Sequence, residues 1–109
     1  MDTIIIKDEA IEAIILNATL GVEGVEDTWK GIEEFIPYLS KDKKHPHGID
    51  FVVADGIISM NIFLIAKYGF DLREVGKDVQ KNVKTQIETM TPFKVGEINV
   101  IVEDIKYED

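Results

Sequence analysis

The chain has 109 residues, 45% of them hydrophobic, which is the length and apolar content of one ordinary domain with one core. Its formal net charge is −9, it contains no cysteine, and its apolar runs are far shorter than the roughly 20 residues that a membrane-spanning helix needs. These features exclude disulfides, thiol catalysis and thiolate zinc sites, disfavour a polyanionic partner, and predict one domain over residues 1–109.

Residues 3–6, "TIII", are predicted to form a short strand, and "DEAIEAIILNATL" is predicted to follow as an amphipathic helix. Asp8 is the predicted N-cap, and Gly21 is predicted to end the helix in a left-handed turn. The first ten residues carry an acid at Asp2 and lack both a basic n-region and a small-residue cleavage site. A secretory signal is therefore not expected, and the chain is expected to be cytoplasmic. The predicted buried face of the helix consists of Ala10, Ile11, Ile14, Ile15 and Ala18.

A long excursion is predicted after this helix, because glycines and prolines interrupt any regular periodicity up to Gly48. Its end, "KDKKHPH", contains His45 and His47, with Asp42 and Asp50 nearby, and imidazoles with carboxylates suit zinc or nickel. Pro46 argues against a regular scaffold for such a site. A solvated loop is the favoured interpretation, and neither a metal nor another cofactor is expected.

A β-hairpin is predicted in "GIDFVVADGIISMNIFLIAKYG", because Asp55-Gly56 suits a two-residue type I′ turn with positive φ at both positions. This turn would pair Val53 with Ile58, Phe51 with Met60 and Ile49 with Ile62. One face of the hairpin is then wholly apolar and continues through Leu64, Ala66 and Tyr68. The opposite face is a mixture of polar and apolar side chains.

A second helix is predicted in "DLREVGKDVQKNVKTQIETM", where Asp71 and Glu74 have the spacing of a capping box. Gly76 is predicted to let a neighbouring backbone come close. Pro92 ends the helix, and the following strand is predicted to lie parallel to the strand that ends at Tyr68. The apolar stripe of the helix consists of Leu72, Val75, Val79, Val83, Ile87 and Met90.

The order of these elements predicts an α+β fold: a two-layer α/β sandwich built from a short strand, a helix, a β-hairpin, a helix and a strand. The sheet is expected to be mixed, with both helices on its apolar face. A ferredoxin-like path is the leading topology.

Three features of residues 61–105 resemble one protein family: a hydrophobic strand ending in "YG", a helix with "VQKNVKTQIETMT", and the closing "VGEINVIVEDI". The opening "IIIKDEAIEAII" and "LGVEGVEDT" agree as well. The chain resembles the alkaline shock protein family, the Gls-type envelope stress response proteins of Gram-positive and related bacteria. It departs from the family at Lys7, at Pro92 and in the longer connection over residues 29–48, where the resemblance implies least.

The resemblance implies a non-enzymatic bacterial stress response protein that is cytoplasmic and abundant under envelope or alkaline stress. It also implies a homo-oligomer that is held near the membrane by a partner protein. The family has no catalytic residues, so none is carried over to this chain.

The outer face of the predicted sheet is one candidate interaction surface, because contiguous exposed apolar patches usually mark contacts. The alternative is that the excursion, with Trp29 and the apolar residues after it, folds back and covers this face. Under the first interpretation copies of the chain join through their sheets. The residues in question are Val52, Ile57, Phe63, Ile65 and Ile101.

A basic stripe on the second helix is another candidate, because Arg73, Lys77, Lys81 and Lys84 recur at helical spacing on an acidic chain. The stripe is either a docking surface for an acidic patch, for example on a second copy, or a solvated helix face with weak ion pairs.

A small KH-like RNA-binding module is the alternative function, because "GVEG" at residues 21–24 fits the G-x-x-G pattern. The variable positions are Val22 and Glu23, where phosphate contact needs a basic side chain, so a helix stop followed by a turn is the simpler interpretation. No nucleophile–base arrangement accompanies Ser40 or Ser59, and an enzyme is therefore not expected.

Overall fold

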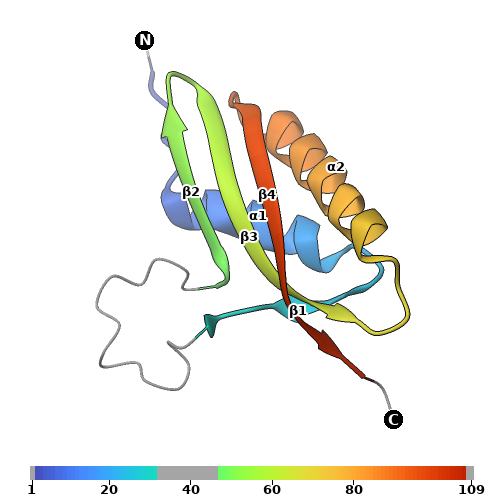
Figure 1. The fold of residues 1–109 in the computed structure, drawn as a ribbon. Helices are drawn as coiled ribbons and strands as arrows, with labels where there is room; N and C mark the ends of the chain where they lie inside the picture. The colour runs from blue at the N-terminus through green and yellow to red at the C-terminus, as the bar shows by residue number, and fades with distance from the viewer. Residues whose placement is uncertain (1, 32–46, 108–109) are drawn as a thin grey trace, which may run out of the picture.

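A computed structural model describes residues 2–31 and 47–107 of the chain (Figure 1). The described elements are α1 (Asp8–Leu20), β1 (Val25–Thr28), β2 (Ile49–Ala54), β3 (Ile57–Lys67), α2 (Leu72–Met90) and β4 (Lys94–Lys106).

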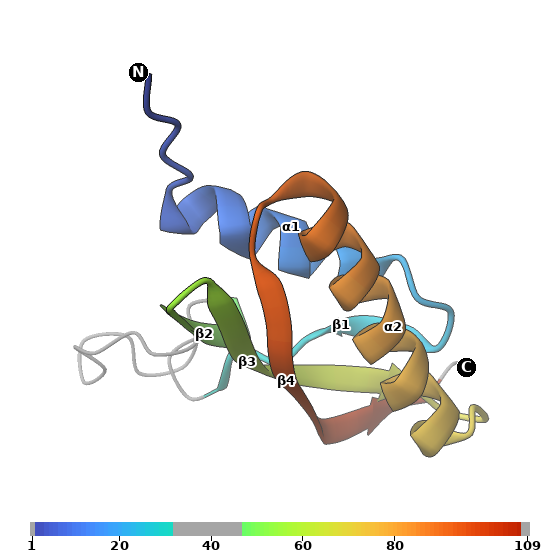
Figure 2. The same cartoon turned by 90° about the horizontal axis from the view of Figure 1, so that it is seen from above.

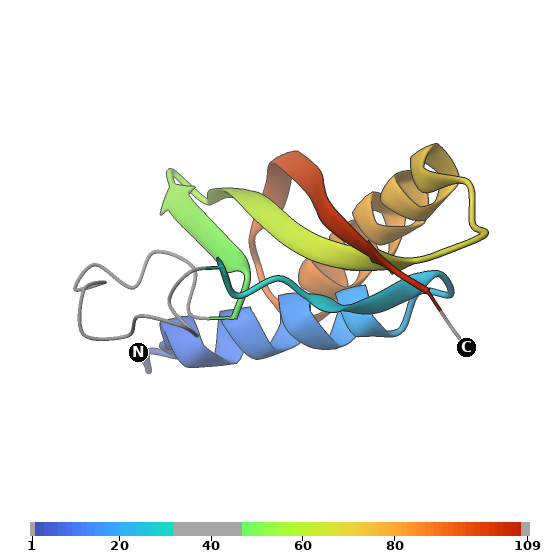
Figure 3. The same ribbon diagram turned by 60° about the horizontal axis from the view of Figure 1, so that its bottom comes forward.

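Strand β3 is the centre of the sheet. β2 pairs with its first half and β1 with its last residues, both antiparallel, while β4 runs parallel to β3 from Ile57 to Lys67. Both helices lie on one side of this sheet, which is clear when the molecule is seen from above (Figure 2) and when it is tilted (Figure 3). The predicted α+β sandwich, with a mixed sheet and two helices on one face, is confirmed.

The predicted opening strand is wrong, because residues 2–7 have no regular secondary structure and belong to no sheet. In a ferredoxin-like fold a strand separates the two parallel strands of a split βαβ unit. Here nothing is inserted, so β3 and β4 hydrogen-bond directly to each other. The remaining elements follow the ferredoxin-like path without its first strand.

The hairpin between β2 and β3 has the predicted register. Ile49 pairs with Ile62, Phe51 with Met60, and Val53 with Ile58. The turn is formed by Asp55 and Gly56, whose φ angles of 55° and 77° are those that a type I′ turn requires. The inward pleat buries Ile49, Ile58, Met60, Ile62, Leu64 and Ala66.

The helices complete the core with the stripes that their periodicity predicts. In α2, Val75, Val79, Val83 and Ile87 are buried, and in α1, Ile11, Ile15 and Ala18 are. Three residues that were predicted to face the core do not. Ala10 is exposed, Met90 is 59% exposed, and Tyr68 is 62% exposed. Met90 is the last residue of α2, and Tyr68 lies just past the end of β3, where its ring stacks on that of Tyr107.

The ends of α1 differ from the prediction, whereas the N-cap of α2 agrees with it. Lys7, and not Asp8, is the N-cap of α1, and no side chain caps this helix. Gly21 ends α1 with φ −78°, so the predicted left-handed turn is wrong. Asp71 caps α2 as predicted, because its Oδ1 accepts from the backbone N–H of Arg73 at 2.9 Å.

Two further predictions about α2 are corrected. Among the described hydrogen bonds Glu74 makes no return bond to Asp71, and its Oε2 lies 3.7 Å from Lys77 Nζ instead. Gly76 does not admit a neighbouring backbone, because a Cβ built there would meet nothing within 4 Å. Neither α1 nor α2 combines the length and the apolar content that crossing a bilayer requires, and the described residues contain no other α-helix.

Candidate interaction surfaces

The outer face of the sheet, turned to the viewer in Figure 1, carries no helix of the described structure. A row of polar side chains crosses it from β2 to β4. Asn61 Nδ2 donates to Asp50 Oδ1 at 3.0 Å, and Asn99 Nδ2 donates to Asn61 Oδ1 at 3.0 Å. We call Asp50, Asn61 and Asn99 the polar ladder.

The polar ladder divides the predicted apolar patch into two groups. Val52 and Ile57 lie on one side of it, near the hairpin turn, and are 63% and 49% exposed. Phe63, Ile65 and Ile101 lie on the other side and are each half-buried. The five residues therefore share a face but do not form one unbroken surface, and their role in binding stays a prediction.

The excursion that was proposed as a lid over this face falls mostly at residues 32–46, outside the described residues. Its two ends meet at Phe63, whose carbonyl accepts from Trp29 N–H and whose N–H donates to Gly48 O, both at 2.8 Å. Gly48 has φ +75°, and a Cβ there would lie 2.7 Å from Trp29 O, so only glycine fits this junction. Trp29 itself is half-buried.

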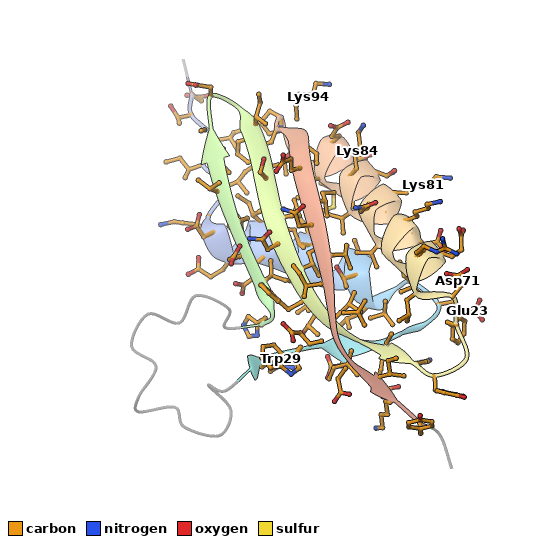
Figure 4. The ribbon with its side chains drawn as sticks, viewed as in Figure 1. Glu23, Trp29, Asp71, Lys81, Lys84 and Lys94 are labelled. Atoms are coloured by element: carbon orange, nitrogen blue, oxygen red, sulfur yellow. The ribbon has the colours of Figure 1, made fainter. Side chains whose placement is uncertain are left out.

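The basic stripe of α2 is partly neutralised by its own helix. Arg73 Nε lies 3.9 Å from Asp71 Oδ1, and Lys77 pairs with Glu74. Lys81 and Lys84 are exposed and have no ion pair within the described residues. They project from α2 beside β4 (Figure 4). Only this part of the stripe is left with uncompensated charge.

A shallow groove, here called the α2/β4 groove, runs between this part of the stripe and β4. Its rim is basic and its floor is formed by half-buried apolar side chains of β4. The sequence predicted the lysines but not the groove, because the groove depends on how α2 crosses the end of the sheet. The lining residues are Lys77, Gln80, Lys81, Lys84, Val95, Gly96 and Ile98.

Residues 2–7, here called the arm, are a feature that the sequence reasoning missed. Ile4 is 90% exposed and Ile5 is 75% exposed, whereas Ile6 packs against the core. The run of isoleucines at residues 4–6 is the sequence signal of the arm, but its pattern predicts a strand of the chain's own sheet.

Among the described residues that were candidates for chemistry, His47 and Ser59 have structural partners. His47 Nε2 lies 3.3 Å from Glu12 Oε1, and His45 and Asp42 lie outside the described residues. Ser59 Oγ accepts from Glu97 N–H at 3.1 Å and so holds a bulge of β4. No group of three metal-ligating side chains occurs in residues 2–31 and 47–107.

The "GVEG" segment links α1 to β1. Gly24 has φ +98°, and a Cβ there would lie 2.7 Å from Val75 Cγ2, so this glycine is needed for packing against α2. Glu23 lies on the same side of the molecule as Asp71 (Figure 4). An acidic turn of this kind gives the KH-like alternative no phosphate-binding surface.

Comparison with known proteins gives the same fold. Among solved structures, MamM-CTD 215–293 has a TM-score of 0.63 at 15% identity, covering 90% of this chain and 99% of that one. A copper form of a MamM CTD variant has a TM-score of 0.62 at 13% identity, covering 94% of this chain and 100% of that one. At these identities the likeness concerns the fold alone.

Sequence comparison is more specific. The family model of alkaline shock protein 23, described as having a cell envelope-related function, matches residues 1–107. The uncharacterized protein YqhY of Bacillus subtilis (strain 168) is 24% identical over 103 residues, with 94% of this chain and 76% of YqhY covered. The uncharacterized protein Spy1614 of Streptococcus pyogenes serotype M6 is also 24% identical over 103 residues, with 93% and 85% covered.

Proposed function

Since the chain belongs to the alkaline shock protein 23 family, whose described function is cell envelope-related, we propose that it is a non-enzymatic interaction protein of the envelope stress response. It works by associating with copies of itself and by docking to a membrane-associated partner protein. It resides in the cytoplasm and reaches the membrane through that partner, without a cofactor and without nucleic acid.

The outer face of the sheet is the observation that carries this proposal. Both helices cover the inner face of the sheet (Figure 2). No helix of the described structure covers the outer face, although apolar sheet faces are normally packed against another layer. Val52 and Ile57, at 63% and 49% exposed, present apolar surface beside the polar ladder. Exposed apolar side chains provide contact area, and polar side chains lie beside them, which is the usual composition of a protein interface.

The chemistry of the polar side chains supports a non-enzymatic role. Asp71 is engaged as a helix cap, Ser59 holds the β4 bulge, and His47 pairs with Glu12. Catalytic groups instead converge on a shared point where a reacting atom can be placed. These three residues belong to different elements and serve separate structural contacts.

The proposal is tested by binding to membrane vesicles from the native cell, measured as protein that co-sediments with them. Wild-type protein is expected to bind, and treatment of the vesicles with protease is expected to abolish binding, because the receptor is a protein. Changing Val52 and Ile57 together to Glu is expected to weaken binding by about tenfold or more, since it places charge in the contact.

The matched control changes two exposed apolar residues of the helix layer, Leu20→Glu and Met90→Glu, which are 43% and 59% exposed. This variant has the same added charge and is expected to bind as the wild type does. Equal losses in both variants, or undiminished binding to protease-treated vesicles, would contradict the proposal.

A further inference from the structure

The arm makes few contacts in the described structure. Ile4 and Ile5 are 90% and 75% exposed, and residues 2–6 make no hydrogen bond with any described residue. An extended backbone with β-branched side chains is well suited to adding a strand to a sheet. The arm cannot insert between β3 and β4 of its own sheet, because these two strands pair directly with each other.

The α2/β4 groove borders an open sheet edge. Within the described strands β4 pairs with β3 alone, so its other edge is free of strand partners. Val95 N–H donates to Glu88 Oε2 at 2.9 Å and Ile98 O accepts from Gln80 Nε2 at 3.0 Å, so α2 side chains satisfy the first part of this edge. Alternation along the strand places the backbone groups of Val100 and Val102 on the same edge.

The arm and the α2/β4 groove carry opposite charges. The arm and the first turns of α1 carry Asp2, Asp8, Glu9 and Glu12 against Lys7. The rim of the groove carries Lys81 and Lys84, which have no ion pair within the described part of the chain. Opposite charges at such surfaces favour encounter and fix the orientation of a complex.

We infer that the arm of one copy binds in the α2/β4 groove of a second copy, an inference that rests on the proposed self-association. The arm lies along the free edge of β4, where its backbone pairs with that of Val100 and Val102. One of Ile4 and Ile5 covers the apolar floor, because neighbouring side chains of a strand point to opposite faces. The acidic residues around the arm face Lys81 and Lys84. Each contact therefore joins two different surfaces, the arm of one copy and the groove of the other.

Two variants separate the surfaces. The arm variant is Ile4→Asp with Ile5→Asp, and the groove variant is Lys81→Glu with Lys84→Glu. Sedimentation equilibrium of the full chain at low ionic strength is expected to show at least about tenfold weaker self-association for each. The substituted residues are exposed, so circular dichroism is expected to show wild-type folding.

Each variant has a matched control. Ile4→Val with Ile5→Val keeps the apolar, β-branched arm and is expected to associate as the wild type does. Lys30→Glu with Lys67→Glu makes the same change in net charge as the groove variant but lies away from the groove. Its association is expected to stay within about twofold of the wild type.

Mixing the two defective variants gives the decisive measurement. The arm variant keeps an intact groove and the groove variant keeps an intact arm, so the mixture has one complete contact. Equal amounts are expected to form a 1:1 dimer that goes no further, at concentrations where each variant alone is largely monomeric. An interface that joins like surfaces, arm to arm or groove to groove, would not be restored in this way, because every mixed contact would then include one defective surface.

Several results would overturn the inference: undiminished association of either variant, or no dimer in the mixture while the wild type associates. Loss of association in Leu20→Glu with Met90→Glu but not in the groove variant would place the arm against the helices instead. A wild-type protein that stays monomeric at all concentrations overturns the inference and the self-association in the proposed function. It leaves the membrane partner to the vesicle test.

Discussion

At the scale of single residues, glycines with similar sequence neighbourhoods have opposite roles. Gly24 lies against α2, where a Cβ would be 2.7 Å from Val75 Cγ2, and its φ of +98° disfavours any other residue. Gly76, one position after Val75, lies within α2 with open space where its Cβ would be. The close approach therefore depends on the glycine in the turn and not on the one in the helix.

Gly76→Ala is expected to raise the free energy of unfolding by roughly 0.5–1 kcal/mol, because alanine favours the helix and meets no neighbour. Urea denaturation followed by the fluorescence of Trp29, the one tryptophan of the chain, measures this change. Gly24→Ala is the control and is expected to lower the same free energy by more than about 1 kcal/mol. A destabilising Gly76→Ala would mean that space at this position is needed after all.

At the scale of elements, β3 presents two different surfaces. Its inward residues from Ile58 to Ala66 are buried against the helices, while its outward residues are a mixture of apolar and polar side chains. The polar ladder at Asn61 interrupts the outward apolar side chains. Interruptions of this kind limit non-specific association of exposed sheet surfaces.

Asn61→Val is expected to join Val52 and Ile57 to the apolar group around Phe63 and so to increase association. Light scattering at increasing protein concentration is expected to show higher apparent mass, with secondary structure unchanged by circular dichroism. Asn61→Thr introduces a residue that is β-branched like valine but polar; it is the control and is expected to scatter as the wild type does. Equal scattering by both variants would show that the polar ladder does not limit association.

At the scale of the whole molecule, the net charge of −9 is poorly compensated. The described ion pairs are partly exposed, such as Lys106 Nζ to Glu26 Oε2 at 3.6 Å, with side chains 61% and 29% exposed. Pairs of this kind contribute little to stability, whereas repulsion among the acidic residues acts over the whole surface.

Sodium chloride is therefore expected to stabilise the folded chain. Raising its concentration from roughly 0.02 to 0.5 M shortens the Debye length severalfold and weakens the repulsion between acidic residues. The urea midpoint is expected to rise, with the larger part of the rise below roughly 0.2 M. A falling midpoint would show that favourable ion pairs outweigh the repulsion.

Salt is expected to have the opposite effect on assembly. Contacts between the arm and the groove of another copy involve Lys81 and Lys84, so the same increase in sodium chloride is expected to weaken self-association. Sedimentation measurements on the wild type across this range check the expectation. Measuring stability and association on the same samples distinguishes the effect of the net charge of the molecule from the effect of the charges at the groove.

Local patterns in the chain were sufficient to predict the hairpin register, the cap at Asp71, the buried stripe of α2 and the parallel last strand. Turn chemistry, capping and periodicity act over a few residues and can therefore be read along the chain. The candidate lysines and the outward apolar residues of the hairpin were found for the same reason.

Packing in three dimensions was needed for the rest. Isoleucines 4–6 favour an extended strand, yet whether they pair depends on β3 and β4, which lie more than fifty residues away and leave no space between them. The polar ladder and the α2/β4 groove likewise join residues from different elements. Such features arise from how elements are placed, which periodicity along one segment does not encode.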